Sequence, residues 1–227
     1  MDILESYLEK NDCKIYKGKE ALKIYRYNRD TFEEICGSAI YDTLDGFMDN
    51  NDEDDIIKLI ICNSKEKPIS VFYGTIELEE NYLSSDYTCS SELPKGGVLL
   101  RFYALLLANE KNNSIQSLIG GISGGIPALL SVDSKDIVEE KREKLREYHI
   151  KNGATINDNK FIYNLSDVKV KIVEMFRTAV ITNATKTNKK RPVDNPPNNE
   201  TKTQTKNKPK NKKHRKEQAA KHPAKPT

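Results

Sequence analysis

The chain has 227 residues and a formal net charge of +3, but this charge is divided unevenly along the sequence. Residues 186–225 hold 14 Lys and Arg against three acidic residues, a balance of +11, so the rest of the chain carries −8. An acidic body excludes binding of nucleic acid by that body alone, whereas a basic tail can neutralise phosphates and release their counterions.

The first part of the body predicts two helices and three strands, assigned from the spacing of apolar residues. In chain order they are a helix at 1–10, a strand at 21–29, a helix from Asp30 or Thr31 to about Met48, and strands at 56–62 and 69–79. The two last strands are separated by a short turn and are expected to form a hairpin. The acid-rich connection at 49–55 has neither the glycine nor the final glutamate of a calcium loop.

The second part continues with alternating strands and helices. They are a weak strand at 87–93, a buried helix at 98–111, a strand at 128–132, a helix from Asp133 or Ser134 that stops before Asn152 and Gly153, a strand at 161–165 and a closing helix at 167–182. A glycine after the last helical turn is a common left-handed stop.

These elements predict a single mixed α/β domain at residues 1–182, with a central mixed sheet flanked by helices. A chain of this length buries about 70% of its unfolded surface, which is enough for one core. Residues 183–227 consist almost entirely of polar and basic residues and cannot form a core, so we expect a disordered Lys-rich tail.

The cysteines and the apolar runs exclude several kinds of protein. Cys13, Cys36, Cys62 and Cys89 lie more than twenty residues apart and never form Cys-x-x-Cys, so we expect reduced thiols and no bound metal. No run approaches the roughly 18 apolar residues of a membrane span, and the start lacks the apolar core of a signal peptide. We therefore expect an intracellular protein, cytoplasmic or nuclear.

The loop at residues 93–98 is the feature most suggestive of chemistry. Pro94, Lys95, Gly96 and Gly97 lead directly into the buried helix, and amides at a helix N-terminus together with an ammonium attract phosphate. The alternative is a turn that only delivers a core helix. The loop is not a P-loop, because no Gly-x-x-x-x-Gly-Lys-Ser/Thr occurs.

The glycine-rich run at 120–125 (GGISGG) lacks the Gly-x-Gly-x-x-Gly order of a dinucleotide fold. Close packing of backbone is our first interpretation of this run, and a flexible lid is the alternative.

Three side chains are candidates for proton transfer. His149 is the one histidine outside the tail, and the alternative to catalysis is a half-buried histidine stabilised by the helix C-terminus. Glu77 and Glu79 lie two residues apart on one face of the predicted long strand. Either could act as a general base if that face lines a cleft, and otherwise they form a solvated strand face.

The tail predicts electrostatic attachment to RNA or DNA, and its alternative role is simply to solvate the chain. It contains no aromatic residue to stack on bases, so binding would be sequence-tolerant and sensitive to salt. The candidate nucleic-acid-binding residues are Lys189, Lys190, Arg191, Lys210, Lys212, Lys213, Arg215 and Lys216.

Three segments resemble the GNAT family of acetyl-coenzyme-A-dependent N-acyltransferases, over about residues 21–165. They are SELPKGGVLLRFYALLLANEKN (91–112), ALLSVD (128–133) and LREYHIKNGATINDNKFIYNL (145–165). The first resembles the loop and helix that bind the cofactor pyrophosphate. The second falls where the fifth strand should splay from the fourth, and the third resembles the helix, turn and closing strand of the family.

The resemblance implies acetyl-coenzyme A as cofactor and transfer of an acyl group to an amine acceptor. It implies that the amides of Lys95, Gly96, Gly97 and Val98 hold the pyrophosphate, that Glu77 or Glu79 accepts the amine proton, and that Tyr148 or His149 protonates the departing thiolate. Both remain candidates for the acid because the family's spacing back from Gly153 falls on His149, and the tyrosine stands one residue earlier.

Two other functions remain open. One is a non-enzymatic, nucleic-acid-associated or structural protein with a degenerate GNAT-like domain and a polyanion-binding tail. The other is a nucleotide-binding regulator that uses the two glycine loops.

Overall fold

The computed structural model describes residues 1–37, 44–46, 48, 54–122 and 135–177. The chain divides into two units, Met1–Lys190 and Arg191–Thr227, and all described elements lie in the first. The helices are α1 (Asp2–Lys10), α2 (Gly18–Tyr27), α3 (Arg29–Cys36), α5 (Gly96–Lys111), α6 (Lys135–Lys151), α7 (Leu165–Ile172) and the π-helical η1 (Val173–Arg177). The strands are β1 (Cys13–Lys17), β2 (Ile56–Asn63), β3 (Pro68–Glu77), β4 (Tyr82–Ser90), β5 (Ser117–Gly121), β6 (Thr155–Asn157) and β7 (Lys160–Asn164).

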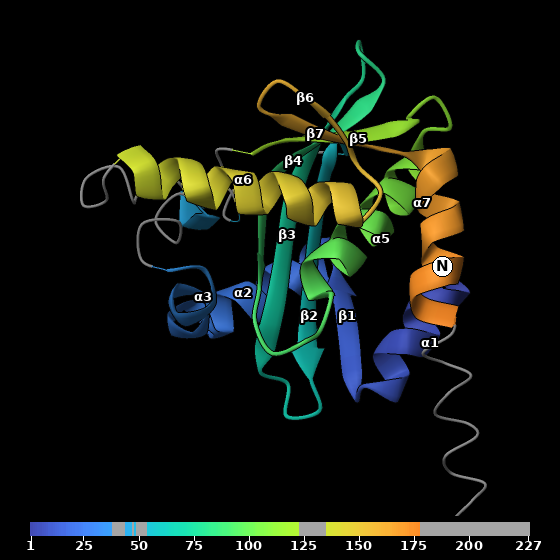
Figure 1. The fold of residues 1–227 in the computed structure, drawn as a ribbon. Coiled ribbons are helices and arrows are strands. Elements are labelled where there is room, and N and C mark those ends of the chain that lie inside the picture. Colours follow the sequence, from blue (N-terminus) through green and yellow to red (C-terminus); the bar gives the residue numbers. More distant parts are fainter. Residues whose placement is uncertain (38–43, 47, 49–53, 123–134, 178–227) are drawn as a thin grey trace, which may run out of the picture. The chain divides into compact units, whose positions relative to one another are not determined.

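The described strands form one seven-stranded sheet in the order β1-β2-β3-β4-β5-β7-β6 (Figure 1). β4 and β5 are parallel, and the other neighbouring pairs are antiparallel. The expected mixed α/β fold, with a central mixed sheet flanked by helices, is confirmed. No helix in the described ranges is long and apolar enough to cross a membrane.

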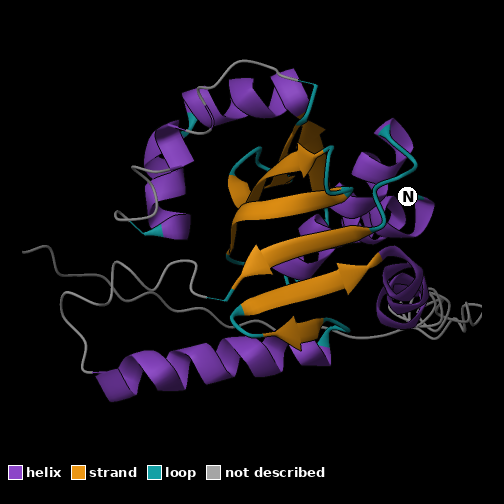
Figure 2. Cartoon of the chain, turned by 90° about the horizontal axis from the view of Figure 1, so that it is seen from above, coloured by secondary structure: helices purple, strands orange, loops and turns teal. Residues whose placement is uncertain are grey.

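Helices cover both faces of the sheet (Figure 2). Successive strand residues point to opposite faces, so each strand contributes side chains to both layers. On β2, Leu59 and Ile61 enter a core cluster with residues of α1, α5 and α7. Ile60 and Cys62 enter a second cluster with residues of α2 and α3. The sheet is therefore buried on both sides, and α5 forms the centre of one layer.

The N-terminal part differs from the sequence prediction. Residues 21–29 were predicted as a strand, but Gly18–Tyr27 is helix α2. Its two buried residues, Ala21 and Tyr25, are four apart, which is helical spacing. The first strand is β1, which the sequence did not predict. The next helix, α3, ends at Cys36, where Gly37 has a φ of 80°, rather than continuing to Met48.

Strand positions also differ further along the chain. β3 ends at Glu77 and not at Glu79, and β4 begins earlier than predicted, at Tyr82. The strand beside β4 is Ser117–Gly121, whereas the strand predicted at 128–132 lies outside the described residues. The hairpin of β2 and β3, the strand at β7 and the stop at Gly153, with a φ of 92°, are confirmed.

A disulfide joins Cys36 at the end of α3 to Cys89 on β4, with 5.3 Å between the Cα atoms. The expectation of four reduced thiols is therefore wrong for this pair, whose members are 53 residues apart in the sequence but adjacent in the fold. Cys13 and Cys62 are free, and burial raises the pKa of the Cys62 thiol to about 12. The disulfide ties α3 to the strand that forms one wall of the site below.

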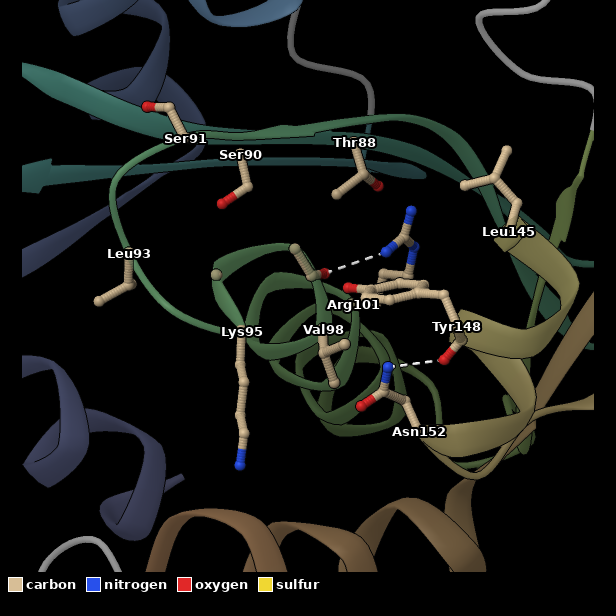
Figure 3. Close-up of a pocket in the computed structure, with 12 residues that line it drawn as sticks. Thr88, Ser90, Ser91, Leu93, Lys95, Val98, Arg101, Leu145, Tyr148 and Asn152 are labelled. Carbon is tan, nitrogen blue, oxygen red and sulfur yellow. Dashed lines mark hydrogen bonds between the residues drawn. The ribbon is translucent and has the colours of Figure 1, made fainter. Parts of the chain in front are cut away.

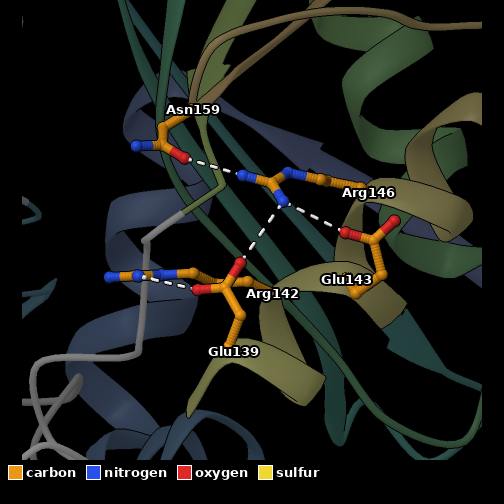
Figure 4. A network of polar contacts seen from close by, with 5 residues as sticks. All are labelled: Glu139, Arg142, Glu143, Arg146 and Asn159. Carbon is orange, nitrogen blue, oxygen red and sulfur yellow. Dashed lines mark hydrogen bonds and ion pairs between the residues drawn. The ribbon is translucent and has the colours of Figure 1, made fainter. Parts of the chain in front are cut away.

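Polar contacts hold α6 against the β6–β7 turn (Figure 4). Arg146 donates from Nη2 to Oδ1 of Asn159 at 3.0 Å, and its Nη1 lies 3.0 Å from Glu143. Arg142 pairs with Glu139 at 3.2 Å. Exposed pairs of this kind contribute little each, and the Asn159 contact joins the helix that carries Tyr148 and His149 to the β6–β7 turn.

Candidate functional site

The site begins where β4 and β5 part. Their parallel pairing runs from Tyr82 opposite Ser117 to Ser85 opposite Gly120. β5 ends at Gly121, but β4 continues to Ser90. Among the described residues, the last part of β4 therefore has no neighbouring strand on its β5 side.

A pocket of about 370 Å³ lies beside this edge of β4, over the N-terminus of α5, and we call it the α5 pocket (Figure 3). It is lined by Thr88, Ser90, Ser91, Leu93, Lys95, Gly96, Gly97, Val98, Arg101, Leu145, Tyr148 and Asn152. The site thus brings together β4, the 93–98 loop, the first turns of α5 and the C-terminal half of α6. The four residues predicted to bind the cofactor all line it.

The first turn of α5 presents free amides. The amide of Gly96 donates to the carbonyl of Leu93 at 3.0 Å, and that of Leu99 donates to Lys95 at 2.9 Å. Between them, the amides of Gly97 and Val98 donate to no group within the described part of the chain. Unpaired N–H groups at a helix N-terminus, where the helix dipole is positive, attract anions.

The two glycines of the loop have different surroundings. A Cβ on Gly96 would overlap the hydroxyl of Ser90, so this glycine is needed for close packing of the loop on the sheet. A Cβ on Gly97 would meet nothing closer than 3.5 Å, its nearest neighbours being Arg101, Tyr148 and Thr88. Gly97 therefore leaves open space inside the pocket.

The ammonium of Lys95 points away from the pocket (Figure 3). Its Nζ lies 3.5 Å from the carbonyl oxygen of Met175 and 5.8 Å from the ring centre of Phe176, both in η1. Lys95 has a φ of 62°, which is uncommon for a residue with a side chain. Its ammonium was expected to face an anion at the loop and instead contacts η1, so Lys95 contributes backbone to this site.

Arg101 supplies the cation that the sequence assigned to Lys95. Its Nη1 donates to the carbonyl of Gly97 at 3.3 Å, and its guanidinium lies 5.2 Å from the ring centre of Phe161. Its Nε is buried without a hydrogen-bond partner, and no described carboxylate forms an ion pair with it. Burial lowers the pKa of the guanidinium, although arginine stays charged.

Tyr148 lies on the wall of the pocket and is 38% exposed. Its hydroxyl is near the open side of Gly97, and Asn152 donates to its carbonyl at 2.7 Å, which holds the end of α6 (Figure 3). Of the two residues predicted as the acid, Tyr148 is the one that reaches the pocket.

His149 instead lies in the core, with 2% exposure. Its ring stacks on Phe161 at 3.8 Å with an interplanar angle of 9°, and its Nδ1 lies 3.0 Å from the hydroxyl of Tyr163. Burial first, and the nearby Arg101 second, lower the pKa of His149 to about 3. A neutral, enclosed imidazole does not act as a general acid at neutral pH.

The structure does not bring Glu77 or Glu79 to the α5 pocket. Glu77 pairs with Tyr82 at the far end of β4, and six residues of strand place it roughly 20 Å from Thr88. Glu79 lies beyond the end of β3, exposed, and not on the strand face predicted for it. Neither carboxylate lines the pocket.

Asp86 is the carboxylate at the point where the strands part, and the sequence interpretation missed it. The register changes between Tyr73 opposite Tyr87 and Gly74 opposite Ser85, so Asp86 is the extra residue of a β-bulge. It accepts hydrogen bonds from Thr75 at 3.0 Å and from Ser84. Bulges re-aim side chains beside functional sites, but a bulge has no signal in a single sequence.

Of the glycine-rich run, Gly120 and Gly121 belong to β5. A Cβ on Gly120 would overlap the ring of Phe161, so this glycine serves close packing. The rest of the run and every tail residue proposed to bind nucleic acid lie outside the described ranges. Among the described residues, no group of three or more His, Cys, Asp or Glu side chains is placed to hold a metal ion.

Comparison with known proteins gives similarity in structure only. No family model matches the sequence, and no curated protein matches it. GCN5 of Tetrahymena is 9% identical, and the match covers 68% of this chain and 96% of that one with a TM-score of 0.42. A GNAT-family acetyltransferase of Staphylococcus aureus is 12% identical, with 67% and 99% of the two chains covered and a TM-score of 0.38. A variant of the spermidine N-acetyltransferase SpeG of Vibrio cholerae is 8% identical, with 69% and 96% covered and a TM-score of 0.40. The chain is similar to these acetyltransferases in fold, at sequence identities of 8–12%.

Proposed function

We propose that this protein is an N-acyltransferase that binds acyl-coenzyme A in the α5 pocket and transfers the acyl group to an amine. The observation that carries the proposal is a guanidinium without an ionic partner among the described residues, next to two free helix amides in one pocket. Guanidinium and helix N-terminal amides together favour a phosphate group.

The residues fit the pyrophosphate in two respects. Arg101 has a buried Nε without a partner, and an anion that accepts a hydrogen bond from this guanidinium would relieve its unpaired charge. Gly97 keeps the space beside Arg101 and Tyr148 open, where a side chain would fill the cradle. In this proposal the amides of Gly97 and Val98 and the guanidinium of Arg101 hold the pyrophosphate, and Lys95 does not.

The part of β4 that extends beyond its pairing with β5 supports a path from the pocket to the point where the strands part. Thr88 and Ser90 line the pocket, and from them the strand leads back to Asp86 at the bulge. Extended chains that carry amides can bind alongside a strand. Coenzyme A, when bound, supplies the activated acyl thioester, and this edge would align its amide-bearing arm.

Two side chains are placed to move protons. Asp86 shares hydrogen bonds with Thr75, which follows Tyr73 by two residues and so lies on the α2 and α3 side of the sheet. Its carboxylate would accept the proton of an amine that arrives from that side. The hydroxyl of Tyr148, on the pocket side, would protonate the departing thiolate.

A thiol-release assay with acetyl-coenzyme A and a panel of amines tests this proposal. We expect turnover by the wild type, a fall in kcat of about 100-fold or more for Asp86→Asn, and little change for Glu77→Gln, which removes a carboxylate far from the pocket. Absence of thiol release with every amine, or a loss in Glu77→Gln and not in Asp86→Asn, would contradict it.

A further inference from the structure

Arg101 rests on an aromatic platform that the α5 pocket itself does not include. Its guanidinium lies 5.2 Å from the ring centre of Phe161 on β7. Its Nη1 donates to the carbonyl of Gly97, and its side chain also interacts with Tyr148. An aromatic face gives a long, flexible arginine a further contact that restricts its direction.

Phe161 is itself fixed from two sides. Gly120 lies opposite Phe161 on the neighbouring strand β5. Because Gly120 has no Cβ, the ring of Phe161 fills the space that a side chain there would occupy. The imidazole of His149 stacks on it at 3.8 Å and 9°. With 2% exposure, the ring has little room to shift.

His149 is fixed in turn by the core. Its Nδ1 lies 3.0 Å from the hydroxyl of Tyr163, whose ring packs edge-on against Phe102 of α5 at 5.5 Å. The order Arg101, Phe161, His149, Tyr163 and Phe102 thus begins and ends on α5. We call Phe161, His149 and Tyr163 the aromatic platform.

We propose that His149 and Phe161 are positioning residues, which hold the Arg101 guanidinium in the direction required to bind a phosphate anion in the α5 pocket. This assigns His149 a role different from proton transfer. The proposal rests on the proposed function in one respect, because it takes the pocket's ligand to be a phosphate-bearing molecule.

The chemistry of the platform suits this role. An uncharged imidazole can stack face to face on a phenyl ring, whereas a second cation next to Arg101 would repel it. Burial keeps the pKa of His149 at about 3, so Arg101 is the one charged group of the stack. The charged groups nearest in sequence on α6, Glu147 and Lys151, are not partners of the His149 ring, which meets Phe161, Tyr163 and Tyr148.

Substitutions at His149 separate stacking from proton transfer. His149→Ala removes the stacked ring, and we expect binding of coenzyme A to the full chain to weaken about tenfold. His149→Phe keeps an aromatic ring but has no nitrogen, and we expect it to restore most of that affinity and to retain kcat. A proton donor would instead lose kcat in both variants, by about 100-fold or more.

A double-mutant cycle tests whether the platform acts through Arg101. Phe161→Leu should weaken coenzyme A binding about tenfold in the wild type, but less than about twofold in the Arg101→Gln background, because the guanidinium that it positions is gone. A purely structural defect would weaken binding equally in both backgrounds, and that result would overturn the proposal. Thermal unfolding of each variant shows which variants are folded. If Phe161→Leu does not fold, His149→Ala takes its place in the same cycle.

A nuclear magnetic resonance measurement makes the outcome independent of the cofactor. The Nε–H signal of Arg101 in the ligand-free protein should be shifted by the ring current of Phe161, retained in His149→Phe and moved in His149→Ala. If the wild type binds inorganic pyrophosphate but not coenzyme A, and the signal behaves in this way, the proposed function fails while the role of the platform stands; binding of neither ligand overturns both. An unshifted signal in the wild type overturns the platform.

Discussion

Gly96 and Gly97 are adjacent in the chain and meet opposite requirements. Gly96 packs against the hydroxyls of Ser90 and Ser70, and Gly97 borders the open space of the α5 pocket. We predict that Gly96→Ala lowers the free energy of unfolding by about 1–3 kcal/mol, because its Cβ overlaps the sheet.

Gly97→Ala is the matched change one residue later. Its Cβ has room in the protein, so we expect unchanged stability and coenzyme A binding weakened about tenfold. Denaturant unfolding and calorimetric titration of the two variants check this pair. Equal loss of stability in both would show that the loop only delivers the helix.

His149 predicts a change of stability with pH. Its pKa is about 3 in the folded protein and about 6.5 when unfolded. Between these values the unfolded chain binds one more proton, so the folded state loses up to about 1.4 kcal/mol per pH unit as the pH falls below about 6.5. Urea unfolding of wild type and His149→Phe at pH 7 and pH 4.5 isolates this effect. Equal losses of unfolding free energy in both proteins would show that burial of the His149 imidazole does not cause this pH dependence.

At the scale of residues, the sequence could identify the loop but not its cation. Lys95 stands beside the glycines and was expected to face the anion, but its left-handed backbone directs the side chain to η1. Arg101 lies six residues after Lys95, about one helical turn beyond Gly97, inside an apolar run. The sequence shows a charged residue within a buried helix, and this is the signal that could have found it. Asp86 has no such signal, because its position depends on a bulge between two strands.

At the scale of elements, the Cys36–Cys89 disulfide predicts a measurable stabilisation. It closes a separation of 53 residues, and cross-links of this length stabilise by about 2–4 kcal/mol through the unfolded chain. We expect dithiothreitol to lower the thermal midpoint of the wild type, and to have no effect on a Cys36→Ser variant, which should already unfold at the lower temperature. A midpoint that does not respond to the reductant would show that the pair does not stabilise the fold.

Elements with strong local signals were predicted correctly, and those set by tertiary contacts were not. The hairpin of β2 and β3 consists of two apolar runs around a turn, and the end of α6 has its glycine. In contrast, residues 21–29 alternate as a strand would, yet they bury Ala21 and Tyr25 in a helix. β1 is a strand through its pairing with β2, and β5 through its place between β4 and β7. Neither pairing is visible in a local sequence pattern.

At the scale of the whole molecule, the division of charge predicts two separable binding activities. Residues 186–225 carry +11 against −8 for the remainder, so we expect the full chain to retain RNA or DNA in a salt-dependent manner. Deletion of residues 186–227 should abolish this retention and leave acetyl-coenzyme A binding unchanged. Filter binding at 50 and 300 mM salt measures it. Retention that survives the deletion would remove the tail from nucleic-acid binding.

The most direct test of the account compares two cations of the same chain. Calorimetric titration with coenzyme A in high salt, which suppresses non-specific binding by the tail, is made on wild type, Arg101→Gln and Lys95→Gln. Both variants lose one positive charge and keep the same tail. We predict one-to-one binding by the wild type, about 10–100-fold weaker binding by Arg101→Gln, and wild-type affinity for Lys95→Gln, whose ammonium contacts η1. Equal losses in the two variants, or no saturable binding by the wild type, would contradict the assignment of the α5 pocket as a coenzyme A site.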